Sequence, residues 1–295
     1  MRIRVVLVLA LVAVGLVGIC IPAVLMYRRL HPDRVVIDDD PGRHGLGYEP
    51  IAFASPVDGA QLRGWYMAAP HPSGRAIVIT PGIDNNRLAS GITLRLAPSF
   101  LAAGFDVLAF DLRGEGESGG APITFGEREQ WDVLGAVHAA EAHGARRVGV
   151  LGFSLGGASA ILAAARSPEI VAIVADSAFA DLRETLTREL ESSDHLPSPV
   201  AAYALVLYRL LSGTDPADVA PATVIGQIAP RPILLIQGGS DQTVPVVDSE
   251  RLLAAADSPT AERWVVPGGR HVESYFADPG GYTSRVAGFF ATAIP

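Results

Sequence analysis

Short apolar runs recur through most of the chain, and stretches with helical spacing separate most of them. Runs of this length suit strands that are buried on both faces of a sheet. The repeated order of strand, helix and strand predicts the α/β class, with a mostly parallel central sheet and helices on both faces. The predicted strands are residues 76–79, 107–110, 148–151, 171–175, 233–236 and 264–266.

Residues 48–69 have a different pattern, because apolar and polar residues partly alternate on each side of Asp58 and Gly59. This alternation predicts an antiparallel hairpin at one edge of the sheet. Ligands of open α/β sheets bind at the carboxyl ends of the strands, so the residues after each run are candidate functional positions. Helices are predicted from near Leu88, around Trp131, after Ser154 and from Tyr282 to Ala293.

The N-terminal stretch has no charged residue from Val5 to Met26. As a helix these roughly 22 residues measure about 33 Å, enough to cross the hydrocarbon core of a membrane. We predict a single transmembrane anchor in residues 1–30, a linker in residues 31–47 and one α/β domain in residues 48–295. A cleavable signal peptide is the alternative, although its apolar region is normally about 7 to 15 residues long. The flanking arginines are nearly balanced and so do not fix the orientation, and we expect an extracytoplasmic domain at the cell membrane.

Charge and cysteine content narrow the possible partners. The net charge of -8, without any basic cluster, argues against a nucleic-acid partner. Cys20 is the only cysteine and lies in the apolar stretch, which excludes a disulfide or a cysteine-based metal site in the rest of the chain. We expect neither a metal nor an organic cofactor.

Residues 152–156 read Gly-Phe-Ser-Leu-Gly and follow a predicted strand directly. A sharp turn from strand to helix exposes the serine hydroxyl, and flanking glycines let the backbone pass closely. The alternative is a glycine-rich turn with an incidental serine, but its place between strand and helix favours Ser154 as a nucleophile.

A serine nucleophile needs a histidine base and an acid that orients the histidine. His271 is the histidine that follows the last predicted strand. Asp241 follows the strand before it and is our predicted acid, with Asp176, after an earlier strand, as the alternative. Backbone N–H groups of Leu155 and Ile83 are the predicted oxyanion donors.

Several motifs together resemble the α/β-hydrolase superfamily, and most closely its BEM46-like and serine aminopeptidase-like hydrolases. They are Gly-Phe-Ser-Leu-Gly-Gly from residue 152, Asp-Leu-Arg-Gly-Glu-Gly-Glu-Ser from 111 and Gly-Gly-Ser-Asp from 238, with His271 after them. The usual His-Gly after the first parallel strand is replaced by Thr80-Pro81-Gly82. The resemblance implies that Arg113 and Asp111 fix a loop, and we expect Glu115 and Glu117 to be solvated there.

Residues 182–228 interrupt the alternating pattern and are predicted to form a cap over the strand ends. The expected reaction is hydrolysis of a small-molecule carboxylic ester or related acyl bond by Ser154, His271 and Asp241. A serine peptidase or thioesterase would use the same residues. A non-catalytic binding or scaffold protein of the same fold is the alternative from another class.

Overall fold

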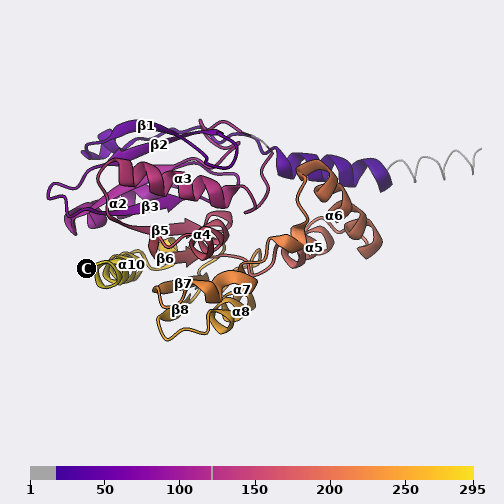
Figure 1. The fold of residues 1–295 in the computed structure, drawn as a ribbon. Coiled ribbons are helices and arrows are strands. Elements are labelled where there is room, and N and C mark those ends of the chain that lie inside the picture. Colours follow the sequence, from indigo (N-terminus) through magenta and orange to yellow (C-terminus); the bar gives the residue numbers. More distant parts are fainter. Residues whose placement is uncertain (1–17, 121) are drawn as a thin grey trace, which may run out of the picture.

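The computed structural model describes residues 18–120 and 122–295, and a sheet of eight strands is its centre (Figure 1). The order across the sheet is β1-β2-β4-β3-β5-β6-β7-β8. The strands are β1 (Glu49–Ala54), β2 (Gln61–Met67), β3 (Arg75–Thr80), β4 (Phe105–Phe110), β5 (Arg147–Phe153), β6 (Ile170–Asp176), β7 (Ile233–Gly238) and β8 (Ala261–Val266).

The direction of the strands agrees with the sequence pattern. β1 and β2 form an antiparallel hairpin at one edge, and β2 pairs with β4 in antiparallel register. From β4 to β8 every neighbouring pair is parallel. The predicted edge hairpin and the mostly parallel sheet are both confirmed, because each apolar run lies in a strand, and these strands are mostly buried except at the edge strand β8.

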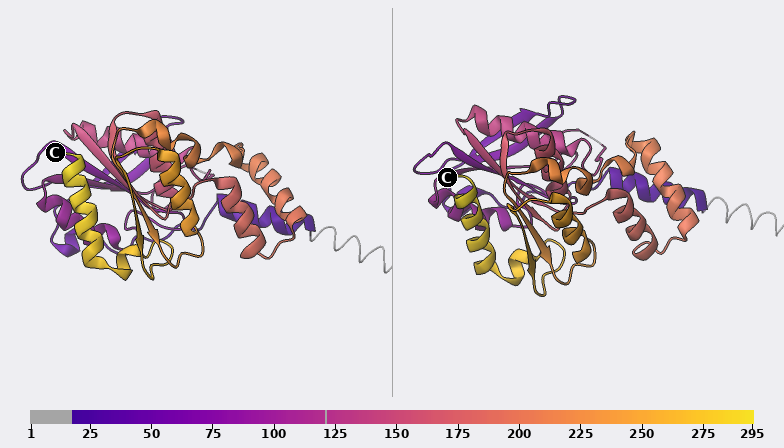
Figure 2. Two further views of the ribbon diagram at one scale, coloured as in Figure 1. Left: turned by 90° about the horizontal axis from the view of Figure 1, so that it is seen from below. Right: turned by 60° about the horizontal axis from the view of Figure 1, so that its bottom comes forward.

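Helices cover both faces of the sheet (Figure 2). On one face α3, α4 and α8 share a core with the sheet, and on the other α2 packs against α10 through Phe100 and Phe290. The helix predicted near Leu88 begins at Ile92, since a turn with left-handed residues precedes it. The bounds are η1 (Pro41–His44), α2 (Ile92–Ala102), α3 (Glu129–Ala142), α4 (Leu155–Arg166), α8 (Val246–Ala256), α9 (Ser274–Ala277) and α10 (Pro279–Ala293).

The stretch predicted as a cap divides into two parts. Helices α5 (Leu182–Ser192) and α6 (Ser198–Ser212) pack against each other and project from one end of the sheet (Figure 1). We call these two helices the cap. The segments that follow return to the domain, where α7 and η3 contact α4 and α8. These later segments are η2 (Pro216–Asp218), α7 (Pro221–Val224) and η3 (Ile225–Ile228).

A helix over residues 18–30 lies beside α5 and α6 in every view (Figures 1 and 2). Met26 and Leu30 are fully buried in the core, and Arg29 bonds Asp194 after α5. The last turn of this helix thus belongs to the folded domain, which the sequence analysis did not anticipate. Residues 1–17, most of the predicted membrane span, lie outside the described residues. Among the helices that the structure does describe, none is both long and apolar enough to cross a membrane.

Candidate active site

Ser154 occupies a tight turn between β5 and α4. Its backbone has φ 50° and ψ -115°, a conformation that residues other than glycine rarely adopt. Glycines make the turn possible, because a β-carbon at Gly152 would collide with the carbonyl of Gly156, and one at Gly156 would collide with the carbonyl of Pro81. The turn therefore holds the serine hydroxyl at the carboxyl end of the sheet.

The structure brings the three predicted site residues together. Nε2 of His271 lies 2.9 Å from Oγ of Ser154, and Nδ1 lies 2.8 Å from Oδ2 of Asp241. The Asp241 side chain is fully buried, whereas that of His271 is 24% exposed and faces the pocket. Backbone N–H groups of Thr243 and Val244 donate to the other carboxylate oxygen of Asp241, each over 2.9 Å. These bonds fix the carboxylate toward the imidazole.

The loops that carry Asp241 and His271 touch each other directly. The N–H of Ser240 donates to the carbonyl of Gly269 over 2.8 Å. Only glycine fits at position 238, because a β-carbon there would collide with the same carbonyl. This close approach sets the separation between Asp241 and His271.

Asp176, the alternative acid, has other partners. It accepts hydrogen bonds from Tyr282 over 2.9 Å, from Ser177 over 2.9 Å and from Ser274 over 3.3 Å. The Ser177 hydroxyl also accepts the N–H of Val272, next to His271. Complete burial raises the pKa of Asp176 to about 6. Its contacts support the histidine loop, and Asp241 is the carboxylate that contacts the imidazole.

The two predicted oxyanion donors line the same pocket as Ser154 and His271. Leu155 is the first residue of α4, so its N–H points out of the helix N-terminus. Ile83 follows Gly82, where a β-carbon would lie 3.2 Å from that of Ser154. Both backbone donors thus come from segments that pass close to the serine.

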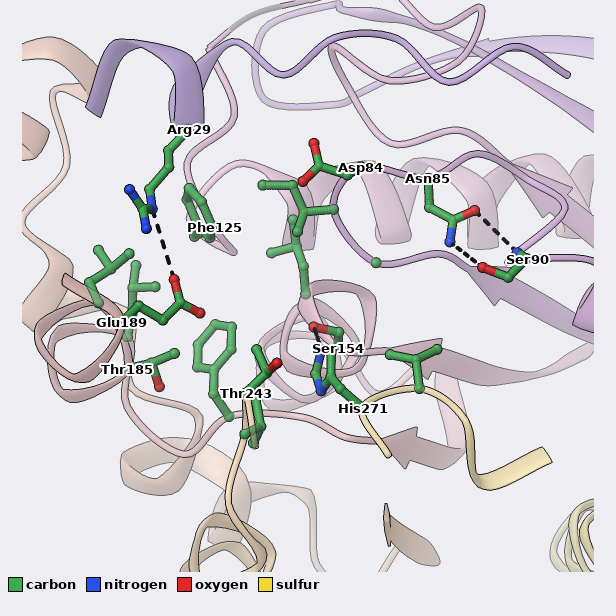
Figure 3. Close-up of a pocket in the computed structure, with 18 residues that line it drawn as sticks. Arg29, Asp84, Asn85, Ser90, Phe125, Ser154, Thr185, Glu189, Thr243 and His271 are labelled. Carbon is green, nitrogen blue, oxygen red and sulfur yellow. Dashed lines mark hydrogen bonds and ion pairs between the residues drawn. The ribbon is translucent and has the colours of Figure 1, made fainter. Parts of the chain in front are cut away.

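A cavity of about 540 Å³ opens above Ser154 (Figure 3). Arg29 and Glu189 lie at the end formed by the helix over residues 18–30 and α5, and Asp84 lies beside Ile83 at the upper side in this view. Burial raises the pKa of Glu189. The wall between is apolar and is made by Ile83, Phe125, Leu155, Phe179, Leu182 and Leu186.

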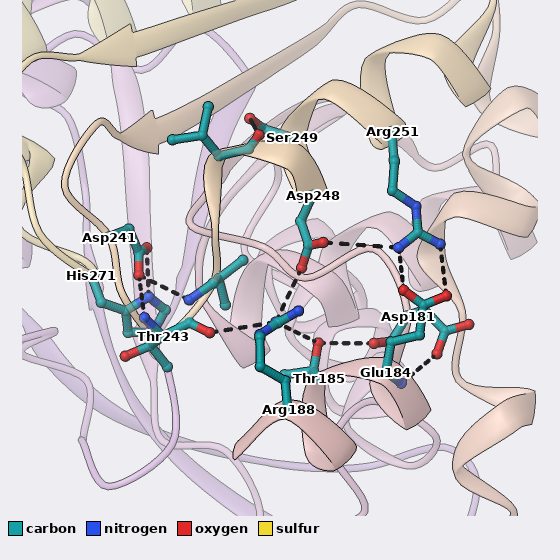
Figure 4. Close-up of polar contacts among 12 residues, drawn as sticks. Asp181, Glu184, Thr185, Arg188, Asp241, Thr243, Asp248, Ser249, Arg251 and His271 are labelled. Atoms are coloured by element: carbon teal, nitrogen blue, oxygen red, sulfur yellow. Dashed lines mark hydrogen bonds and ion pairs between the residues drawn. The ribbon is translucent and has the colours of Figure 1, made fainter. Parts of the chain in front are cut away.

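Polar contacts tie helix α5 to the loop that carries Asp241 (Figure 4). Arg188 of α5 donates to the carbonyl of Thr243 over 3.4 Å and lies 3.5 Å from the carboxylate of Asp248. One turn earlier, Glu184 pairs with Arg251 of α8. Helix α5 is therefore held by polar contacts with α8 and with the loop at Thr243, as well as through its apolar face.

Two buried ion pairs hold the loop after β4. Asp111 pairs with Arg87, and Arg113 pairs with Asp132 at 2.6 Å, so the two residues fix this loop through separate partners. Glu115 was expected in solvent but is fully buried, and burial raises its pKa to about 8. Its partner is a backbone N–H from a distant loop, which no local sequence pattern indicates.

Glu117 is solvated, as predicted, because its side chain is 66% exposed. It also lies 2.9 Å from Arg87. Arg29 and Glu189 are pocket residues that the sequence analysis did not single out. Arg29 lay inside the predicted anchor, and only the packing of that helix against the cap places it here.

The parallel sheet, the strained serine turn and the adjacent histidine and aspartate define an α/β-type hydrolase fold. The chain belongs to the alpha/beta hydrolase fold family, whose model matches residues 75–198. It is 31% identical over 247 residues to the uncharacterized protein YqkD of Bacillus subtilis, covering 82% of this chain and 79% of that protein. Rv2307c of Mycobacterium tuberculosis, also uncharacterized, is 34% identical over 231 residues, 75% and 72% of the two chains.

Among solved structures, the esterase Pf2001 of Pyrococcus furiosus is similar over 90% of this chain and 98% of its own. The TM-score is 0.75 and the sequence identity 26%. Family membership and this likeness to an esterase support a hydrolytic function acting on a small-molecule substrate.

Proposed function

We propose that this protein is a serine hydrolase that cleaves carboxylic esters through an acyl-enzyme intermediate. The observation that carries the proposal is the continuous set of hydrogen bonds from Ser154 through His271 to Asp241 at the floor of a cavity. The likeness to an esterase supports the choice of an ester substrate. The proposal includes membership in the BEM46-like or serine aminopeptidase-like subgroup, on the motifs given above.

In the first half of the reaction, Ser154 attacks the ester carbonyl while Nε2 of His271 takes the hydroxyl proton. Asp241 keeps Nδ1 protonated and stabilises the imidazolium that forms. The negative charge on the carbonyl oxygen is bound by the N–H groups of Leu155 and Ile83. His271 then gives its proton to the departing alcohol, and the acyl group remains on Ser154.

In the second half, water attacks the acyl-enzyme and His271 accepts its proton. Collapse of the second tetrahedral intermediate releases the carboxylic acid and returns the proton to Ser154. Every proton is moved by His271, so this mechanism uses no metal or organic cofactor.

Labelling with a fluorophosphonate probe tests the nucleophile. We expect the unmodified protein to be labelled and Ser154→Ala to lose the label. Ser159→Ala is a matched control, because Ser159 lies on the same helix and is fully buried away from the probe. Labelling that persists in Ser154→Ala, or that is absent from the unmodified protein, would overturn the proposal.

Peptidase action is a second candidate, since the carboxylates of Asp84 and Glu189 both line the cavity. Two carboxylates beside one arginine suit a substrate that carries an amino group. A panel of nitrophenyl esters of increasing acyl length, acyl thioesters and aminoacyl nitroanilides separates the candidates. We expect the highest kcat/KM with an ester. A clear preference for nitroanilides would assign a peptidase, and a preference for thioesters a thioesterase.

We further propose that the uncharged N-terminal stretch anchors the chain in the cell membrane, with the catalytic domain outside the cytoplasm. Pro22 and Met26 are buried, and Leu25 packs against the core, which leaves residues 5–21, about 26 Å as a helix, for the membrane. Such a stretch is at the lower end of the length that spans a bilayer. In its described part, Ile19 is more than half exposed, as a lipid-facing side chain would be.

Carbonate extraction of membranes tests the anchor, and protease protection in intact spheroplasts tests its orientation. We expect the full chain to stay in the membrane pellet and to be digested by external protease. Release by carbonate would contradict the anchor. Protection until the cells are lysed would place the domain in the cytoplasm.

A further inference from the structure

A fully buried glutamate lies behind the loop that carries the second oxyanion donor. Oε1 of Glu115 accepts the backbone N–H of Asp84 over 2.8 Å. Its Oε2 is buried and has no hydrogen-bond partner in the described part of the chain. Because a buried oxygen without a partner costs about 1–3 kcal/mol, stability alone does not account for a glutamate here.

The bond acts next to the candidate donor. Asp84 has a φ of 54°, in the left-handed region, and directly follows Ile83. Peptide groups are planar, so fixing the N–H of Asp84 fixes the plane that joins it to Ile83. Only φ and ψ of Ile83 then separate that plane from the N–H of Ile83 itself. A change at Glu115 is thus transmitted to the oxyanion donor.

We propose that Glu115 is a positioning residue, which holds the N–H of Ile83 toward the oxygen of the tetrahedral intermediate through its bond to Asp84. This inference rests on the proposed hydrolase function. Glu115 itself does not line the pocket, whereas Gly82, Ile83 and Asp84 do. Its effect is therefore on the geometry of the loop and not on substrate contact.

The surroundings of Glu115 keep its carboxyl group in place. Asp84 and Asp111 are the nearby acids, and Arg34 is the nearby base. Arg34 donates to the carbonyls of Gly116 and Ser118, so it fixes the glutamate's own loop. The carboxylate of Asp111 is paired with Arg87 and is thus largely neutralised.

Two substitutions of similar length separate positioning from stability. Glu115→Gln keeps an oxygen that can accept the N–H of Asp84, whereas Glu115→Met fills the same space without an acceptor. We expect Glu115→Met to lower kcat about 10- to 100-fold with KM changed less than about 3-fold, because one oxyanion donor is misplaced. We expect Glu115→Gln to keep kcat within about 3-fold. Glu117→Gln, in the same loop but exposed, is the control.

A second measurement excludes a purely structural effect. A trifluoromethyl ketone binds serine hydrolases as a tetrahedral adduct, and its affinity should fall in Glu115→Met by the same factor as kcat. The melting temperature of Glu115→Met should not fall below that of the unmodified protein, and the number of fluorophosphonate-reactive sites should stay the same. Equal kcat per reactive site in Glu115→Met and the unmodified protein would overturn the inference. Equal losses in Glu115→Gln and Glu115→Met would also overturn it, while the proposed function would stand.

Discussion

The rim of the sheet and the cap make up the pocket in different ways. At the rim, Ser154, His271 and Asp241 are joined by hydrogen bonds of 2.8 and 2.9 Å, and the acid is fully buried. Under the cap, the polar residues Arg29 and Glu189 are 20% and 27% exposed and lie 3.9 Å apart. Short buried bonds impose one geometry, whereas longer and wetter ion pairs tolerate several.

This difference separates two roles in the proposed reaction. The rim determines which bond is broken, because its groups must be aligned within a few tenths of an ångström for proton transfer. The cap determines what enters, since it supplies apolar wall and a charged end. Changes at the rim should therefore act on kcat, and changes in the cap on KM.

The largest effect is expected from the base at the rim. His271→Ala should lower kcat/KM for a nitrophenyl ester at least about 10⁴-fold, because among residues 18–120 and 122–295 His271 alone is hydrogen-bonded to the Ser154 hydroxyl. Steady-state assays measure this loss, and the melting temperature checks that the cap remains folded. His138→Ala, an exposed histidine on α3, is the control and should behave like the unmodified protein. Residual activity above about a tenth would break the assignment of the rim.

The next largest effect distinguishes the two rim carboxylates. Asp241→Asn should lower kcat about 10³- to 10⁴-fold, since an amide favours the wrong histidine tautomer. Asp176→Asn should lower kcat less than about 10-fold, because the Asp176 side chain bonds Ser177, Ser274 and Tyr282 and not the imidazole. Comparing the two kcat values decides the acid. The reverse ranking would assign the role to Asp176.

The rim could be predicted from the sequence better than the cap could. At the rim the signals are local, because Ser154 lies between two glycines at a strand end and Asp241 and His271 follow β7 and β8. Parallel strands bring their carboxyl ends to one edge, so the position of each residue after its strand was sufficient to predict that they meet. The sheet itself was predictable from apolar runs for the same reason.

The remaining features depend on contacts between distant segments. Arg29 enters the pocket only because the helix over residues 18–30 packs against α5, and an uncharged stretch gives no sign of that packing. Glu115 is buried because it meets the N–H of Asp84, and Arg113 pairs with Asp132, 19 residues away. Charged residues in a loop are usually solvated, so a sequence pattern favours the wrong environment for them.

A pH dependence of stability sharpens the contrast between a buried acid near the rim and the exposed acids elsewhere. The pKa of Glu115 is about 8 when folded and 4.5 in a solvated chain. Between these values the folded protein holds a proton that the unfolded chain has lost, so the free energy of unfolding falls as pH rises and then levels above pH 8. Urea unfolding from pH 5 to 8.5 should show this decline. In Glu115→Met the decline in the free energy of unfolding should be smaller by at least about 1 kcal/mol, and in Glu117→Gln the decline should be unchanged.

The smallest effect is expected where the helix over residues 18–30 meets the cap, and it tests whether this end of the pocket acts on binding alone. Arg29 donates to Asp194 over 2.7 Å and faces Glu189, so Arg29→Met should loosen the helix over residues 18–30 against α5. We expect KM for a long-chain ester to rise about 3- to 10-fold with kcat within about 2-fold, because the bonds among the rim residues are untouched. Arg28→Met, an exposed neighbour on the same helix, is the control. A fall in kcat with unchanged KM would mean that the cap helps to align the rim, and the separation of roles would fail.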